Sequence, residues 1–200
     1  EYNVPRAKAL LDMFGYIDRD GDGYRERADG SPLELKANSA PTARDQQIDE
    51  LWKRSMDDIG VKISFRKAKW PDLLKEARVG KLMMWQLGGA ASAPDAETWL
   101  GSLYGKNIEG NLARFRLAEY DRQYEKSRAM PDSPERTRVY QEMARLVAAY
   151  APWKINTHRI RTDMWHPHLV GYHRPLLAAT NFWKYIDIDA AKQAQRTANK

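Results

Sequence analysis

The sequence contains no cysteine, which excludes disulfide bonds, thiolate nucleophiles and cysteine-ligated zinc. It also lacks any apolar run close to the roughly 18 residues that a membrane-spanning helix requires. Hydrophobic residues still make up 42% of the 200 residues, which is ordinary for a globular protein. This length has room for one domain with a sizeable core or for two very small ones.

Three common catalytic signatures are missing as well. There is no Gly-x-Ser-x-Gly elbow, no His-Glu-x-x-His zinc motif and no phosphate-binding Gly-x-x-x-x-Gly-Lys loop. Carboxylates occur in pairs, but no pattern indicates that two of them converge. We therefore expect a binding protein rather than an enzyme.

Positive charge is present without being segregated. The net charge is +6, but lysine and arginine alternate with acidic residues, as they do over residues 119–128. A nucleic-acid reader is expected to gather its basic residues on one face. A nucleic-acid-binding domain, which would retain DNA in a salt-dependent way, is therefore the weaker hypothesis, and we expect no nucleic-acid partner.

Strand and helix patterns alternate along the first part of the chain. Alternating or continuous apolar residues predict strands at 33–37, 61–65 and 82–87, the last of them an inner strand. Apolar stripes with caps predict helices at 4–14, after Thr42, and from Trp70 to before Gly80. This order predicts an α/β fold with a mixed, mostly parallel sheet flanked by helices.

The second half of the chain reads as mainly helical. Patterns predict helices within 95–104, at 117–129, and after a capping box formed by Asp132 and Glu135. Two further strands are expected, at 153–157 and 183–188. The tail from Ala190 is polar and is expected to fray.

The order of these motifs resembles the C-terminal lobe of family 5 extracellular solute-binding proteins, the peptide/nickel class that serves ABC importers. No single motif is specific, but their order and spacing over about residues 2–188 are. The resemblance is carried by residues 3–16, 18–26, 30–35, 46–63, 70–73, 80–85, 111–121, 134–140, 151–152 and 170–172.

The resemblance implies one lobe of a two-lobed, type II periplasmic-binding-protein architecture. Residues 1–165 would form the C-terminal α/β lobe, and residues 166–200 would return toward an N-terminal lobe that precedes this region in the family. The function implied is the capture of a peptide-like or other small organic solute in a cleft between lobes. The partners implied are that N-terminal lobe and a membrane permease, at the periplasmic or extracellular face of the cytoplasmic membrane.

The resemblance also implies ligand-binding residues around the end of the third strand. They are Trp70, Trp85, Gln86, Leu87, Gly88, Gly89 and Asp95. The two tryptophans would stack on a ligand, although both also lie in apolar stripes that suit a core. Peptide-binding members carry an aspartate for the ligand's α-ammonium where this chain has Gly88, which disfavours free peptide N-termini. Asp95 could equally be the cap of the next helix.

Two clusters support an alternative hypothesis, a metal- or calcium-binding protein. Asp18, Asp20 and Asp22 match the first half of an EF-hand loop, with Asp29 at its twelfth position where a glutamate is usual. His158, His166, His168 and His173 lie within sixteen residues and could hold a transition metal. A plain turn and surface histidines are the simpler interpretations, so we expect no obligatory cofactor and keep calcium as the alternative.

Overall fold

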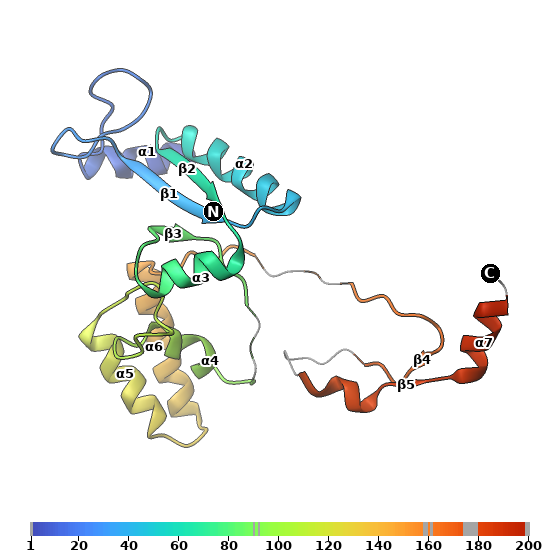
Figure 1. The fold of residues 1–200 in the computed structure, drawn as a ribbon. Coiled ribbons are helices and arrows are strands. Elements are labelled where there is room, and N and C mark those ends of the chain that lie inside the picture. The colour runs from blue at the N-terminus through green and yellow to red at the C-terminus, as the bar shows by residue number, and fades with distance from the viewer. Residues whose placement is uncertain are drawn as a thin grey trace. The chain divides into compact units, whose positions relative to one another are not determined.

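The computed structural model describes residues 2–89, 91, 93–157, 160, 162–173 and 180–198. Contacts divide the chain into two units, Glu1–Gly88 and Gly89–Lys200 (Figure 1). The expected division at residue 165 marks where the chain would cross to the other lobe. It is a different kind of boundary from one based on contacts, and it stays a prediction. No helix in the described part of the chain is both long enough and apolar enough to cross a membrane.

The first unit contains a parallel three-stranded sheet. The strands are β1 (Glu34–Ser39), β2 (Lys62–Lys67) and β3 (Met84–Trp85), and their order across the sheet is β2-β1-β3. The register pairs Leu35 with Ile63 and Asn38 with Trp85. The α/β class and the parallel pairing are therefore confirmed. The expectation that 82–87 is an inner strand is wrong, because β1 is central and, among the described strands, β3 pairs with β1 alone.

Two crossover helices, α2 (Ala43–Asp57) and α3 (Trp70–Arg78), lie on opposite faces of this sheet. Lys67 forms an ion pair with Asp49 of α2, whereas the preceding residue Arg66 pairs with Glu76 of α3. Successive side chains of a strand point to opposite faces, so the two helices must cover different faces. The crossovers β1-α2-β2 and β2-α3-β3 run in opposite directions across the sheet, and two right-handed crossovers of opposite direction place their helices on opposite faces.

The N-terminal helix α1 (Val4–Met13) begins and ends as its sequence predicts. The Asn3 side chain accepts a hydrogen bond from the Arg6 N–H at 2.9 Å, and Gly15 follows the helix with a positive φ of 80°. The nearly buried Arg25 side chain connects α1 to the turn after α2, because it pairs with Asp12 and its Nε donates to the Ile59 carbonyl at 2.8 Å. The loop between α1 and β1 is thereby fixed to the layer of helix and sheet.

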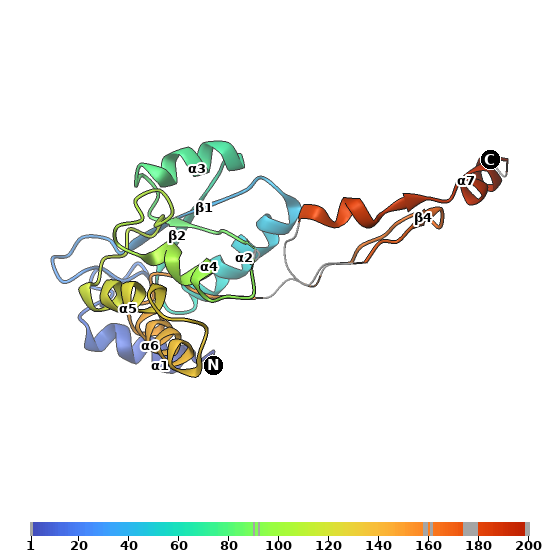
Figure 2. The same ribbon diagram turned by 90° about the horizontal axis from the view of Figure 1, so that it is seen from below.

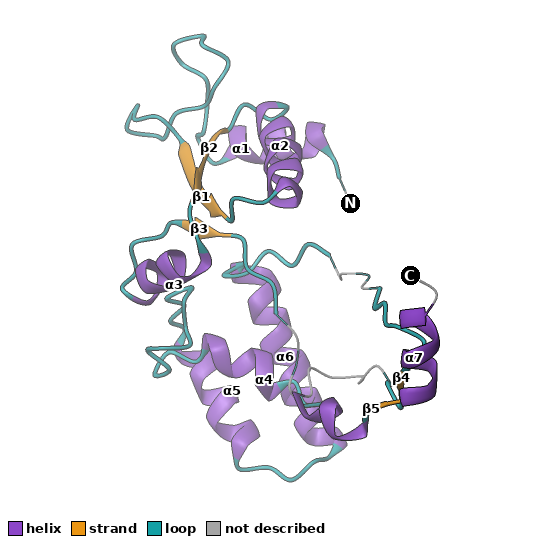
Figure 3. Ribbon diagram, turned by 45° about the vertical axis from the view of Figure 1, so that its right-hand side comes forward, coloured by secondary structure: helices purple, strands orange, loops and turns teal. Residues whose placement is uncertain are grey.

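The second unit is built on helices (Figure 3). It contains α4 (Glu97–Leu100), a 3-10 turn (Gly101–Leu103), α5 (Ala118–Arg128) and α6 (Pro134–Tyr150). Helices α5 and α6 pack side by side (Figure 2). The buried residues between these elements form one cluster, namely Leu100, Leu103, Tyr120, Tyr124, Val139, Met143 and Val147.

Several details of the second unit differ from the sequence-based expectation. The cap of α6 is Ser133, whose hydroxyl accepts from the Arg136 N–H, and not Asp132. Residues 153–157 form no strand, since no described strand pairs with them and Ile155 is 72% exposed.

The C-terminal segment also differs. Strand β4 (Leu169–Val170) pairs antiparallel with β5 (Asp187–Ile188), so only the last two residues of the expected strand 183–188 are a strand. The rest of that stretch belongs to a 3-10 helix (Thr180–Tyr185). The polar tail forms helix α7 (Ala190–Ala198) instead of fraying at Ala190.

We expect Leu103→Ala to lower the free energy of unfolding by about 2–5 kcal/mol, because it leaves a cavity in a tightly packed cluster. Leu103 is fully buried, whereas Ile108 is 68% exposed and serves as the control. Ile108→Ala should change stability by no more than about 0.5 kcal/mol. Urea unfolding of both variants checks this, and equal effects would contradict the assignment of the core.

Candidate functional site

Two tryptophans meet at the carboxyl ends of the parallel strands. Trp85 ends β3, and Trp70 begins α3 just after the end of β2. Their ring centroids are 4.9 Å apart and the ring planes are tilted by 47°. Trp70 is 51% exposed and Trp85 is half-buried. Ligands of open α/β sheets bind outside the carboxyl ends of the strands, so this aromatic pair occupies the expected location.

Asn38 holds the short strand β3 in place. Its Nδ2 donates to the Met84 carbonyl at 2.8 Å, and its own carbonyl accepts from the Gln86 N–H at 3.1 Å. Its Oδ1 accepts from the Arg66 Nε at 2.8 Å. Asn38 is only 5% exposed, and these bonds satisfy its amide group. This residue was missed at the sequence level, where an asparagine inside a strand gives no distinctive signal.

The other predicted ligand residues fall into two groups. Gln86 is half-buried beside Asn38, and Leu87 and Gly88 are exposed. These three follow Trp85 directly and belong to the same unit. Gly89 and Asp95 belong to the second unit. Contact of any of these residues with a ligand stays a prediction.

Asp95 joins the start of α4 to α6. Its Oδ1 accepts from the Glu97 N–H at 2.8 Å and from the Tyr140 hydroxyl at 3.0 Å, while its Oδ2 pairs with Arg136 at 2.6 Å. The backbone hydrogen bond from Glu97, followed by the Arg136 guanidinium, lowers the pKa of Asp95. Desolvation and the bond to Asp95 raise the pKa of Tyr140 to about 12, so this hydroxyl remains a donor at neutral pH.

This network supports the capping interpretation of Asp95, while its contact with a ligand stays a prediction. The formal cap of α4 is Ala96, one residue later than the predicted cap, but the Asp95 carboxylate does accept a hydrogen bond from the first turn. Both of its oxygens are engaged within the second unit. Asp95 is therefore a structural link between two helices in this structure.

The aspartate loop does gather carboxylates. Oxygens of Asp18, Asp20, Asp22 and Glu26 lie within 4.8 Å of one another. Glu26, which is buried, takes the ninth position of the EF-hand pattern that begins at Asp18, and that position was the signal that could have identified it. Asp29, expected at the twelfth position, is not in the cluster and accepts hydrogen bonds from Ser31.

The same loop is also satisfied by its own backbone. Asp18 accepts from the N–H groups of Gly21 and Gly23 at 2.8 and 3.0 Å, and Asp22 accepts from Tyr24 N–H at 2.7 Å. Glu26 accepts from Arg19 N–H at 2.7 Å. These bonds stabilise the turn without an ion, so calcium binding stays a prediction.

The histidines form a smaller arrangement than the sequence suggested. His158 lies outside the described residues. The rings of His166 and His168 stack with centroids 5.2 Å apart. Over the residues that the structure describes, no metal-capable group of three ligands includes a histidine.

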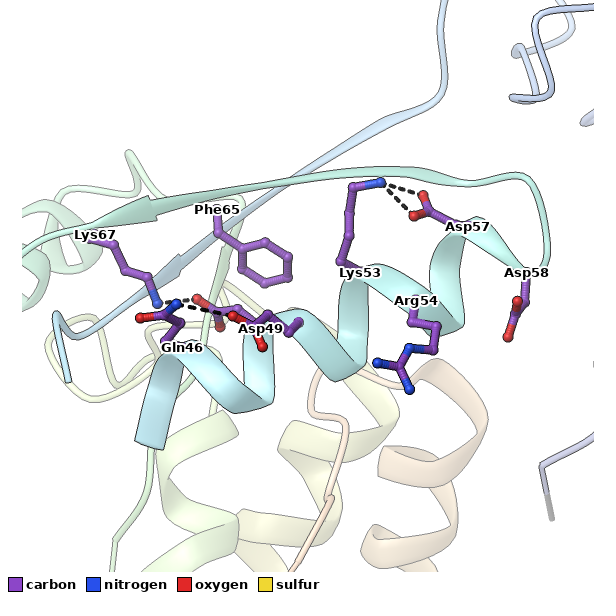
Figure 4. A pocket seen from close by; sticks show the side chains of 9 residues that line it. Gln46, Asp49, Lys53, Arg54, Asp57, Asp58, Phe65 and Lys67 are labelled. Atoms are coloured by element: carbon purple, nitrogen blue, oxygen red, sulfur yellow. Dashed lines mark hydrogen bonds and ion pairs between the residues drawn. The ribbon is translucent and has the colours of Figure 1, made fainter. Parts of the chain in front are cut away.

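A groove of about 520 Å³ lies between α2 and β2 in the first unit (Figure 4). Its charged walls are largely self-paired, since Lys53 pairs with Asp57 and Lys67 with Asp49. Phe65 lies between these two pairs. None of the predicted ligand residues lines this groove. It does not coincide with the carboxyl-end site.

Comparison with known proteins defines the class to which this fold and site belong. The family model of bacterial extracellular solute-binding proteins, family 5 (middle region), matches residues 1–111, which is more than half of the chain. The chain therefore belongs to the family 5 extracellular solute-binding proteins.

Particular relatives support this membership. Heme-binding protein A of Haemophilus influenzae is 27% identical over 173 residues, covering 86% of this chain and 30% of that protein. Di/tripeptide-binding protein 1 of Pseudomonas aeruginosa is 25% identical, covering 76% of this chain and 27% of that protein. The chain thus spans less than a third of the length of these relatives.

A solved structure supports the fold. The oligopeptide-binding protein AppA of Bacillus subtilis, in complex with a nonapeptide, superposes with a TM-score of 0.67 at 19% identity. The match covers 76% of this chain and 31% of that one. This confirms the expected architecture, in which the chain corresponds to one lobe of a type II periplasmic binding protein.

We expect Asp95→Asn to destabilise the protein by about 1–2 kcal/mol at pH 7, because it weakens a charge-assisted hydrogen-bond network. A lowered folded-state pKa contributes stability that is fully present above the unfolded carboxyl pKa of about 4 and is lost as the pH falls through the folded value. The difference between Asp95→Asn and the parent should therefore shrink from pH 7 toward pH 3. Asp132→Asn, an exposed aspartate in the turn before α6, is the control and should show no such trend. Denaturant unfolding at a series of pH values measures both, and a difference that is independent of pH would refute this role.

Proposed function

We propose that this chain is the C-terminal lobe of the substrate-binding component of an ABC importer, and that it acts outside the cytoplasmic membrane. The Trp70–Trp85 pair at the carboxyl ends of the sheet is the observation on which this proposal depends. It supplies a partly exposed aromatic surface at the place where such folds bind ligands. The proposed role is binding and delivery to a permease, without a chemical step.

The ligand we propose is a peptide-like or other small organic solute with an apolar or aromatic part. The relatives named above are a heme-binding protein and a di/tripeptide-binding protein, and AppA was solved with a nonapeptide. Indole rings bind apolar and aromatic groups by stacking and by burial of apolar area. Gly88 supplies no carboxylate for an α-ammonium group, which favours a solute that lacks one at this position.

We further propose that an N-terminal lobe completes the binding cleft. The chain spans about 30% of its relatives, which leaves room for such a lobe in the whole protein. The segment from residue 166 onward exposes large apolar side chains, with Trp183 at 69%, Tyr185 at 65% and Ile188 at 54%. Exposed apolar side chains gathered in one segment indicate an interface. The expected return of residues 166–200 to the other lobe would cover them.

Replacing the aromatic pair tests the binding role. In the full-length protein, Trp85→Ala and Trp70→Ala should each weaken solute binding by about tenfold or more, because a stacked ring contributes one to a few kcal/mol. Phe14→Ala removes an aromatic ring that is 70% exposed on the same unit and should leave binding unchanged. Isothermal titration with hemin and with alanyl-phenylalanine measures the affinities. Unchanged affinity in both tryptophan variants would contradict the proposed site.

A second function, calcium binding by the aspartate loop, is favoured by one observation. Buried Glu26 joins the three predicted aspartates within 4.8 Å, although the predicted twelfth ligand does not. If the loop holds calcium, then about 1 mM calcium should raise the melting temperature of the protein, since a ligand that binds only the folded state stabilises it. Asp20→Asn should abolish this rise, and Asp29→Asn, outside the cluster, should not. A melting temperature that is indifferent to calcium would reduce the loop to a plain turn.

A further inference from the structure

A third tryptophan lies against the loop that follows β3. A methyl group placed on Gly89 would come within 2.8 Å of Trp99 Cη2 and 3.3 Å of its Cζ3. Contacts this short do not occur for real side chains, so the ring rests directly on the Gly89 backbone. Trp99 is nevertheless 42% exposed, which leaves part of the indole open to solvent. The ring therefore contacts the loop through one part and can contact a solute through another.

Both ends of α4, the helix that carries Trp99, are anchored. At its start, the Asp95 carboxylate receives the Glu97 N–H and pairs with Arg136 of α6. At its end, the buried Tyr120 hydroxyl donates to the Leu100 carbonyl at 2.7 Å. A four-residue helix held at both ends has little freedom to tilt or rotate, so the position of the indole is set before a ligand arrives. Such preorganisation reduces the entropy cost of binding.

The acidic groups near Trp99 are already neutralised. Asp95 pairs with Arg136, and Glu97 lies 3.5 Å from Arg136 and 3.7 Å from Arg128. The Tyr124 hydroxyl also donates to Glu97 at 3.2 Å. A ligand ammonium group would have to compete with these arginines for either carboxylate. The pairing of these two carboxylates therefore favours an uncharged group as the partner of the Trp99 ring.

We propose that Gly89 and Trp99 form an apolar subsite within the second unit, which takes an aromatic or other uncharged flat portion of the solute. The subsite rests on the proposed solute-binding function and adds to it a further residue and a narrower ligand class. Glycine at position 89 admits the ring at this distance, and a larger residue would displace the ring. Trp99 is the wall of the subsite, and Asp95 and Arg136 act as positioning residues for it.

The experiment uses the full-length protein with three probes, namely hemin, alanyl-phenylalanine and its N-acetylated form. Trp99→Ala should weaken the tightest-binding probe by about tenfold or more, and Trp99→Phe, which keeps a flat ring, should stay within about threefold of the parent. N-acetylation should change the affinity of the dipeptide by less than about threefold, since Asp95 and Glu97 are already paired with arginines. Melting temperatures of the variants show whether the fold is kept. Gly89→Ala, which displaces the ring without removing it, should also weaken binding while leaving the melting temperature within about 2 °C.

Trp85→Ala separates this inference from the proposed function. If Trp85→Ala weakens binding and Trp99→Ala does not, the subsite is refuted and the binding function stands. If neither variant affects binding, the proposed function fails together with the subsite. An acetylated dipeptide that binds more than tenfold more weakly than the free one would overturn the uncharged character of the subsite. Failure of the parent to bind any probe would count against the ligand class itself.

Discussion

The site depends first on one buried side chain, Asn38. A two-residue strand such as β3 has few backbone hydrogen bonds of its own, and it would separate easily from the sheet edge. The Asn38 amide adds a bond to the Met84 carbonyl, and the Asn38 backbone accepts from Gln86. A buried polar group must have partners, so the requirement of Asn38 for hydrogen bonds also specifies where β3 lies. Trp85 takes its position from this constraint.

The second unit fixes its part of the loop by different means. Its core is a cluster of apolar side chains between α4, α5 and α6, and hydrogen bonds from Tyr120 and Asp95 connect α4 to that cluster. The loop that leaves β3 then reaches Gly89, which lies beneath Trp99. Polar side chains thus position the aromatic rings in both units. This division of roles lets exposed indoles remain ordered without being buried themselves.

Much of the fold was predictable because helix caps and hydrophobic periods are local. Asn3, Thr42 and Gly15 marked helix ends correctly, and alternation gave β1 and β2. The edge position of the strand within 82–87 was not predictable, because an apolar run does not reveal how many neighbouring strands pair with it. The expected strand at 153–157 failed for the same reason. Pairing partners are a property of the whole sheet and not of the segment.

For the site, aromatic content and the resemblance brought out Trp70, Trp85 and Asp95, but Asn38 and Arg136 gave no local signal. Asn38 bonds to Met84, 46 residues away along the chain, and Arg136 pairs with Asp95, 41 residues away. The most direct test of the account is a crystal structure of the full-length protein with the solute that co-purifies with it. The account predicts solute atoms within about 4 Å of the Trp70 and Trp85 rings. A solute bound elsewhere, with both indoles in contact only with protein, would contradict it.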